Sequence, residues 1–304
     1  MAEMLTLPSF AKINWTLEVL GKRPDGFHEL RTLLQTISVA DELDFELLDR
    51  GIELRCTHPL MPLDETNLIY RAAQLVLETT GSDKGVRVTI RKHLPMAAGL
   101  GGGSSNAAVT LLALQRLWGV ELETPDLFRL GARLGADVPF FFLGGTCVGV
   151  GRGDEVYPTV DIEAGFLLLV NAGIAVPTRE VYGNLPSELT NPGAVTKMPI
   201  SLSAAYDALS GSHQRNGEFF PTLHNDLEPP VLLRHPLLRE IKQRLLQGGA
   251  QGVLMSGSGS TIFAFFDSEA TRSVAQQDLQ ETGWWCAPAH TLSRAAYRQA
   301  LQLS

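Results

Sequence analysis

Apolar and polar residues alternate near the start of the chain, which predicts a β-strand. The apolar set is Ala11, Ile13, Trp15 and Leu17, and the polar set is Lys12, Asn14, Thr16 and Glu18. Side chains two positions apart share a face of a strand, so Lys12 and Asn14 lie roughly 6–7 Å apart and can face one site. A solvent-exposed polar face is the alternative interpretation of the same pattern.

Later segments mix helical and strand patterns. Helical spacing of apolar residues predicts helices over 67–80, 104–118, 124–135, about 201–210 and about 235–247. Strands are predicted at 86–90 and 166–171, as two strands with a turn over 138–151, and as two strands within 253–266. Strand and helix do not alternate strictly, which favours an α+β fold. Glycine and charged residues over 149–158 predict two domains, 1–155 and 156–304.

A glycine-rich run separates the strand at 86–90 from the next helix. Gly99, Gly101, Gly102 and Gly103 lie in it, directly before Ser104 and Ser105. Glycine lets the backbone approach a ligand closely, and the first N–H groups of a helix attract anions, so this run predicts a phosphate site. No lysine follows the glycines as in a Walker A loop, and the Rossmann spacing ends on Ser104 instead of glycine. A flexible turn is the alternative.

Composition narrows the class of partner. The 304 residues are 44% hydrophobic and 19% charged, which is typical of a globular protein, and the formal net charge is −8. This charge disfavours nucleic acid or an anionic membrane as the main partner. The three cysteines have no zinc-binding or C-x-x-C spacing, and the first residues lack a signal-peptide pattern, so we expect reduced thiols in a cytoplasmic protein.

Other candidate residues are ambiguous on local grounds. Asp137 precedes an apolar run and can be a site carboxylate or a turn cap. His28 and Phe27 follow a predicted turn at 24–26, where structural roles are common. The second glycine run, 256–260, fits a phosphate site or a hairpin equally well, and the segment 224–228 reads most simply as a helix start.

Taken together, these segments resemble the GHMP small-molecule kinase superfamily. Its signature loop, P-x-x-x-G-L-G-S-S-A-A, is matched by the run from Pro95 to Ala108. A narrower resemblance, to members that phosphorylate a cytidine diphosphate derivative of methylerythritol, is carried by 11–14, 23–30, 98–106 and 135–140, with weaker matches at 224–228 and 256–260. The similarity spans nearly the whole chain.

The resemblance implies a two-domain α+β fold. The N-terminal domain would be ribosomal-protein-S5-like, the C-terminal domain ferredoxin-like, and the active site would lie between them. It also implies ATP and Mg²⁺ as cofactors, a small-molecule substrate, and no nucleic-acid or membrane partner. A homodimer is left open. Three alternatives remain: a GHMP kinase with another acceptor, a non-catalytic nucleotide-binding regulator, and an RNA-binding protein, which the net charge disfavours.

The resemblance also assigns roles to residues. Lys12 and Asp137 match the catalytic pair. ATP contacts are implied for Pro95, Met96, Ala97, Ala98, Gly99, Leu100, Gly101, Gly102, Gly103, Ser104, Ser105, Asn106 and Asn67. Substrate contacts are implied for Asn14, Phe27, His28, Thr178 and Tyr182. The metal ligands are not assigned, and Ser104 and Ser105 both stay candidates.

Two of these positions differ in type from relatives. Phe27 replaces a frequent tyrosine, and Tyr182 replaces a phenylalanine of some members. We expect both rings to sandwich the cytosine, because stacking needs a π face and not a hydroxyl.

Overall fold

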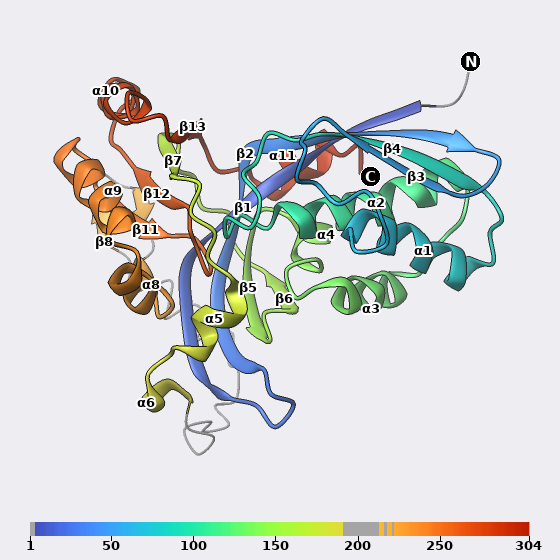
Figure 1. The fold of residues 1–304 in the computed structure, drawn as a ribbon, viewed down its shortest axis with the longest axis horizontal. Helices are drawn as coiled ribbons and strands as arrows, with labels where there is room; N and C mark the ends of the chain where they lie inside the picture. Colours follow the sequence, from blue (N-terminus) through green and yellow to red (C-terminus); the bar gives the residue numbers. More distant parts are fainter. Residues whose placement is uncertain (1–3, 191–212, 216–217, 221, 304) are drawn as a thin grey trace.

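The computed structural model describes residues 4–190, 213–215, 218–220 and 222–303, which form two main sheets with helices packed on them (Figure 1). The mixture of segregated sheets and helices confirms the predicted α+β class. The helix predicted near 201–210 lies outside the described residues. The domain boundary near residue 155 stays a prediction.

The first sheet is built around a long antiparallel pair. Its seven strands are β1 (Met4–Lys22), β2 (His28–Leu48), β3 (Ile52–Cys56), β4 (Gly85–Arg91), β5 (Thr146–Gly151), β6 (Glu155–Pro158) and β10 (His224–Asn225). The order is β10-β1-β2-β4-β3, and β5 pairs with both β2 and β6. Only the β1–β10 and β3–β4 pairs are parallel.

Four helices accompany this sheet, and the first three largely match their predicted ranges. They are α1 (Leu68–Thr80), α2 (Gly102–Trp118), α3 (Thr124–Leu134) and α4 (Phe140–Leu143). α1 begins where the Asn67 side chain accepts a hydrogen bond from the Ile69 N–H, and α2 ends at Gly119 in the left-handed conformation. α2 is buried along most of its length in the apolar core beneath the sheet, so the position of its N-terminus is firmly determined.

The second sheet is antiparallel, in the order β11-β12-β7-β13. Its strands are β7 (Leu167–Asn171), β11 (Gly252–Met255), β12 (Ile262–Phe265) and β13 (Trp285–Ala289). The remaining elements of this half are α5 (Thr178–Gly183), α6 (Ser187–Thr190), the paired strands β8 (His213–Arg215) and β9 (Glu218–Phe220), α8 (Glu228–Arg234), α9 (Pro236–Gln247) and α10 (Glu269–Gln280). α9 and α10 pack against the sheet (Figure 1). The strands predicted at 166–171 and within 253–266, and the helix at 235–247, are confirmed.

One prediction about local structure was wrong. The segment 138–151 holds a single strand, β5, preceded by the short helix α4, because Pro139 adopts a helical backbone conformation and starts a turn. The structure excludes the alternative interpretation of β1 as a strand with a solvated polar face, because Lys12, Asn14 and Thr16 are buried like their apolar neighbours. Polar elements from other parts of the chain therefore cover that face.

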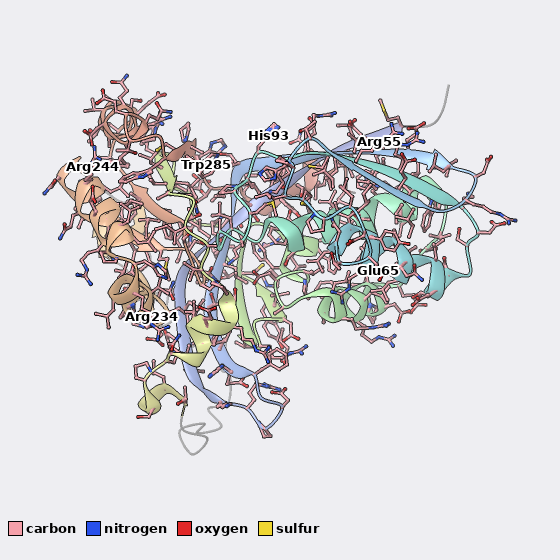
Figure 2. All side chains as sticks on the ribbon, viewed as in Figure 1. Arg55, Glu65, His93, Arg234, Arg244 and Trp285 are labelled. Carbon is pink, nitrogen blue, oxygen red and sulfur yellow. The ribbon has the colours of Figure 1, made fainter. Side chains whose placement is uncertain are left out.

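The C-terminal part of the chain returns to the first sheet. Thr291 pairs with Ile37 of β2, and α11 (Arg294–Ala300) follows at once. The buried Tyr297 hydroxyl donates a hydrogen bond to the Phe141 carbonyl oxygen, and both rings belong to the first core. Figure 1 shows α11 in the half of the molecule that contains α2 and α4, and Figure 2 shows side chains filling the space between the elements on both sides.

Candidate active site

Hydrogen bonds from other segments to its carbonyl oxygens hold the first glycine loop in place. Ala98 O accepts from Thr261 N, Gly99 O from the Ser256 hydroxyl, and Leu100 O from Lys12 N. Gly101 precedes α2 in the left-handed conformation, with φ of 68°. No side chain caps α2, and its first turn holds no acidic residue. The helix starts at Gly102, two residues earlier than predicted, and presents an N-terminus suited to an anion.

The second glycine loop, 256–260, joins β11 to β12 and lies against the first. A Cβ atom added at Gly99 would lie 2.1 Å from the Ser256 carbonyl oxygen, so the two backbones are in direct contact. A Cβ atom added at Gly257 would lie 3.1 Å from Lys12 Nζ and 3.4 Å from Asn14 Oδ1. The loop therefore covers the polar face of β1 and brings both glycine runs to one place.

Lys12, Asn14 and Asp137 meet beside these loops, as the sequence predicted for Lys12 and Asn14. Lys12 Nζ donates to Asn14 Oδ1 at 2.7 Å and lies 3.6 Å from Asp137 Oδ2. The Asn14 amide in turn donates to the Thr32 hydroxyl at 2.7 Å. The Lys12 side chain is 4% exposed and that of Asp137 is 36% exposed, so a buried ammonium group faces a carboxylate that solvent or a ligand can reach.

A second group of predicted residues surrounds Tyr182 on α5. The His28 ring stacks on the Tyr182 ring with centroids 5.0 Å apart. Burial raises the pKa of the Tyr182 hydroxyl, and the negative charge of Asp137 raises it further. The Thr178 hydroxyl lies 2.9 Å from the Ser258 hydroxyl, which connects α5 to the second glycine loop.

Phe27 lies apart from Tyr182 in this arrangement. Its ring is 55% exposed, and the Arg152 guanidinium lies 5.1 Å from the ring centroid. The structure thus brings His28, and not Phe27, against Tyr182, and the cytosine sandwich stays a prediction. Arg152 was not singled out from the sequence, because only the pairing of β2 with β5 brings it near the turn that carries Phe27.

His28 combines burial with an unpartnered nitrogen. Its Nε2 atom is buried and has no hydrogen-bond partner among the described residues. Burial lowers the pKa of the His28 imidazole below 6.5, and the positive charge of Lys22 lowers it further. The ring is therefore neutral at neutral pH and can offer a donor or an acceptor to a ligand.

This pKa shift predicts a pH dependence of stability. Between the lowered folded-state pKa and 6.5, the unfolded chain binds a proton that the folded chain does not. The free energy of unfolding therefore falls as the pH is lowered through that window. Urea unfolding measures the free energy of unfolding at about pH 7 and about pH 5. The decrease between these two pH values is expected to be smaller for the variant His28→Gln than for the wild type. Equal losses in both proteins would contradict the shift.

The structure separates the polar residues of the loop–helix junction. The buried Ser9 hydroxyl donates to Asn106 Oδ1 and lies 2.8 Å from the Ser105 hydroxyl, and Ser105 and Asn106 are both buried. Ser104 is only half-buried and lies toward Gly135, whose added Cβ would be 3.7 Å from the Ser104 hydroxyl. Of the two serines, Ser104 therefore lies nearer the segment that carries Asp137.

Asn67, predicted to contact adenine, has a structural role. Its Oδ1 accepts from Ile69 N, and its Nδ2 donates to the Pro62 carbonyl oxygen. The adenine contact stays a prediction. The remaining residues of the first loop, Pro95, Met96 and Ala97, form its exposed and half-buried first part, where Ala97 has a φ of 49°.

Asn225 has a role beside the second glycine loop that the sequence does not predict. The segment 224–228 was interpreted as a helix start, and α8 does begin at Glu228. The Asn225 side chain, however, donates to the carbonyl oxygens of Met255 and Gly257, both at 2.8 Å. A polar residue next to a glycine loop in space leaves no periodic signal in the sequence, so only the fold reveals it.

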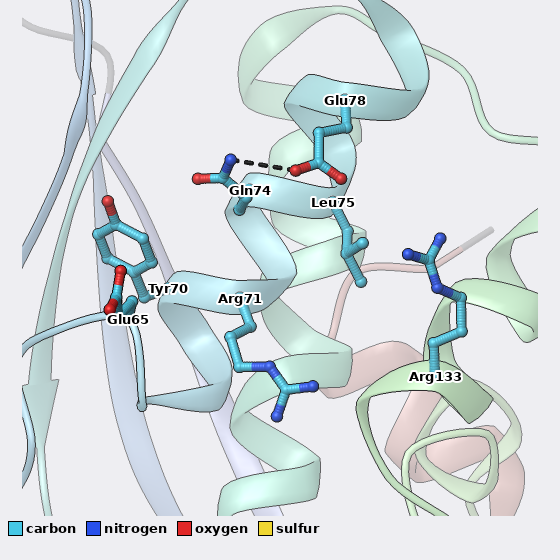
Figure 3. A pocket seen from close by; sticks show the side chains of 7 residues that line it. All are labelled: Glu65, Tyr70, Arg71, Gln74, Leu75, Glu78 and Arg133. Atoms are coloured by element: carbon cyan, nitrogen blue, oxygen red, sulfur yellow. Dashed lines mark hydrogen bonds between the residues drawn. The ribbon is translucent and has the colours of Figure 1, made fainter.

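A pocket of about 380 Å³ lies between α1 and α3 (Figure 3). Its lining residues are Glu65, Tyr70, Arg71, Gln74, Leu75, Glu78 and Arg133. None of them is a predicted site residue. We therefore locate the candidate active site where the two glycine loops meet Lys12 and Asp137, and not in this pocket.

The described part of the chain shows no metal-binding cluster, no disulfide and no membrane-spanning helix. No cluster of three or more His, Cys, Asp or Glu side chains is placed there to hold a metal ion. All three cysteines are unpaired, and burial raises the pKa of the Cys147 thiol to about 11. None of the described helices has the length and apolar character needed to cross a bilayer.

Comparison with known proteins agrees with this geometry. Models of the GHMP kinase N-terminal and C-terminal domains match residues 67–145 and 204–283. The 4-diphosphocytidyl-2-C-methyl-D-erythritol kinase of Syntrophus aciditrophicus is 44% identical over 93% of this chain and 97% of its own length. The protein of the same name from Geobacter sp. strain M21 is 40% identical over 95% and 99%.

Solved structures give the same result. A crystal structure of 4-(cytidine 5'-diphospho)-2C-methyl-D-erythritol kinase matches with a TM-score of 0.77 and 36% identity, over 94% of this chain and 99% of that one. Homoserine kinase from Cytophaga hutchinsonii shares the fold, with a TM-score of 0.68, 19% identity and coverage of 96% of each chain. The predicted two-domain kinase fold is thereby confirmed, and this chain belongs to the GHMP kinase family and, within it, to the 4-diphosphocytidyl-2-C-methyl-D-erythritol kinases.

Proposed function

We propose that this protein transfers the γ-phosphoryl group of ATP to the 2-hydroxyl of 4-diphosphocytidyl-2-C-methyl-D-erythritol, a step of the non-mevalonate route to isoprenoid precursors. The observation that carries the proposal is the buried Lys12 ammonium beside Asp137, at the contact of two glycine loops. Phosphoryl transfer depends mainly on positioning and on stabilising negative charge, and this arrangement offers both. We infer the acceptor molecule from the names of the relatives.

Asp137 and Lys12 have distinct roles in this mechanism. The Asp137 carboxylate orients the acceptor hydroxyl and accepts its proton as the new P–O bond forms. The Lys12 ammonium stabilises the negative charge that develops between the reacting oxygen and the phosphoryl group. Asn14 holds Lys12 Nζ through its Oδ1 atom, and Thr32 fixes the Asn14 amide, so the ammonium group is oriented before substrate binds.

The first glycine loop fits the triphosphate of ATP. The N-terminus of α2 combines unpaired first-turn N–H groups with the positive end of the helix dipole, and no carboxylate in the first turn competes for them. Bound Mg²⁺ would neutralise charge on the phosphate oxygens. Ser104 is the side chain of this loop best placed to contact it, because Ser105 is buried and its hydroxyl is already hydrogen-bonded to that of Ser9.

The region of His28 and Tyr182 fits the cytosine end of the substrate. The neutral His28 ring can pair with a base edge through Nε2, which is buried and unpartnered among the described residues. Phe27 and Tyr182 supply aromatic faces for stacking. Thr178 lies between this region and the second glycine loop, where the diphosphate of the substrate would run.

The proposal predicts turnover with one acceptor among several. ADP formation from Mg-ATP is measured with 4-diphosphocytidyl-2-C-methyl-D-erythritol, homoserine and mevalonate in parallel. We expect ADP release only with the first acceptor. We also expect competitive inhibition by CDP, because a kinase for homoserine or mevalonate needs no cytosine pocket.

Turnover with only homoserine or mevalonate would support the kinase activity but contradict the assignment of a cytosine site. Silence with all three would favour a nucleotide-binding regulator. A cytoplasmic location stays a prediction.

A further inference from the structure

Asn225 is a buried polar residue that belongs to neither substrate site. It is 4% exposed on the short strand β10. Its Nδ2 atom donates to the carbonyl oxygens of Met255 and Gly257, and its Oδ1 atom accepts from Leu227 N at 2.9 Å. The side chain therefore holds the entry to the second glycine loop through two backbone carbonyls.

β10 is in turn fastened to the strand that carries Lys12. It pairs in parallel with β1, with Leu17 opposite Asn225. Asp226 reinforces the pairing, because its N–H donates to Leu17 O at 3.0 Å and its Oδ2 accepts from Val19 N at 2.7 Å. One short segment thus ties β1 and the second glycine loop to each other.

Gly257, whose carbonyl oxygen Asn225 holds, also lies beside Lys12. Gly257 is buried with a φ of 55°, and an added Cβ would lie 3.1 Å from Lys12 Nζ. The Gly257 peptide therefore limits where the ammonium group can lie. A displacement of about 1 Å in a catalytic group can cost about 100-fold in rate.

We propose that Asn225 is a positioning residue for phosphoryl transfer: by holding the Gly257 carbonyl it keeps the second glycine loop against Lys12 and Asn14, and so sets kcat without touching either substrate. The inference rests on the proposed kinase function, since its main readout is turnover. If Asn225 had a purely structural role, replacing it would lower stability without a specific decrease in kcat.

Asn171 provides a matched control. It is also 4% exposed, its Nδ2 also donates two hydrogen bonds to the same loop region, at Ser260 and Thr261, and its Oδ1 also accepts from a backbone N–H, that of Gly173. Its contacts lie at the far end of the loop. Removing either amide should therefore cost similar stability, but only Asn225 acts on Gly257.

The test compares Asn225→Ala with Asn171→Ala. We expect similar falls in melting temperature, a decrease in kcat of about 10- to 100-fold for Asn225→Ala only, and KM values for ATP and the acceptor within about threefold of wild type. Hydrogen exchange should quicken at the amides of 256–258 in Asn225→Ala. Asn225→Asp, which keeps the size and the acceptor for Leu227 N, should reproduce the kcat loss if the alanine variant does not fold.

Several results would overturn the proposal. They are an equal kcat loss in the two alanine variants, a change in KM without a change in kcat, or unchanged exchange at 256–258. If the wild type uses a different acceptor, the proposed substrate fails, and the same kcat comparison is made with the acceptor that is turned over. A failure of the substrate assignment is thereby distinguished from a failure of Asn225.

Discussion

Asp137→Asn is expected to lower kcat for acceptor phosphorylation by about 10²- to 10⁴-fold. The amide keeps the size of the carboxylate but cannot accept the hydroxyl proton, and it removes the negative charge 3.6 Å from Lys12 Nζ. The KM for ATP should stay within about threefold, because the phosphate loop is held by contacts that do not involve Asp137. Initial rates with each substrate varied in turn measure both quantities.

Asp126→Asn is the control for this variant. Asp126 forms an ion pair with Arg129 on α3, and its side chain is 37% exposed, against 36% for Asp137. Removing its charge alters the net charge of the protein equally but leaves the two glycine loops untouched. We expect wild-type kcat from Asp126→Asn, and near-normal turnover by Asp137→Asn would refute the assignment of Asp137 as the base.

Gly99→Ala is expected to reduce kcat/KM for ATP by at least about 100-fold. A methyl group there would lie 2.1 Å from the Ser256 carbonyl oxygen and 3.0 Å from the backbone N and O of Gly259. These are backbone atoms of the second glycine loop, and they cannot move without moving that loop. The first glycine loop must therefore shift away from the second. The N-terminus of α2 and Lys12 would then no longer face the same point.

Gly81→Ala separates this packing effect from backbone strain. Gly81 has a φ of 68°, close to the 76° of Gly99, but an added Cβ there would meet nothing within 4 Å. Both variants suffer the left-handed penalty of about 1–2 kcal/mol. Gly81→Ala should be less stable but fully active, and a Gly99→Ala enzyme of equal kcat/KM would exclude close loop contact as the reason for glycine.

Local patterns in the sequence were enough to predict most helices and strands and the position of the first glycine loop before a helix. The helices near 67–80, 124–135 and 235–247 carry their own apolar spacing and end signals, so no distant information is needed to predict them. The glycine run predicted an anion site for the same reason. The proximity of Lys12 and Asn14 followed from strand geometry, and the structure confirms it with a hydrogen bond.

Features that depend on distant contacts could not be predicted from such patterns. The polar side of β1 resembles a solvated face until the second glycine loop covers it. The stacking of Tyr182 on His28 joins residues more than 150 positions apart. α4 was misread as a strand because three consecutive phenylalanines have no period, and only Pro139 indicates the turn.

The return of α11 to the first core affects how the protein is made. Tyr297 and Leu301 complete a core that otherwise consists of residues from the first half of the chain. A ribosome releases these two residues long after the other buried members of that core, so the half with the first glycine loop cannot finish packing until they emerge. A chain that stops short of Tyr297 would expose apolar surface near Phe141. Chaperones and proteases act on such surfaces, so incomplete chains would be removed instead of persisting as ATP-binding fragments.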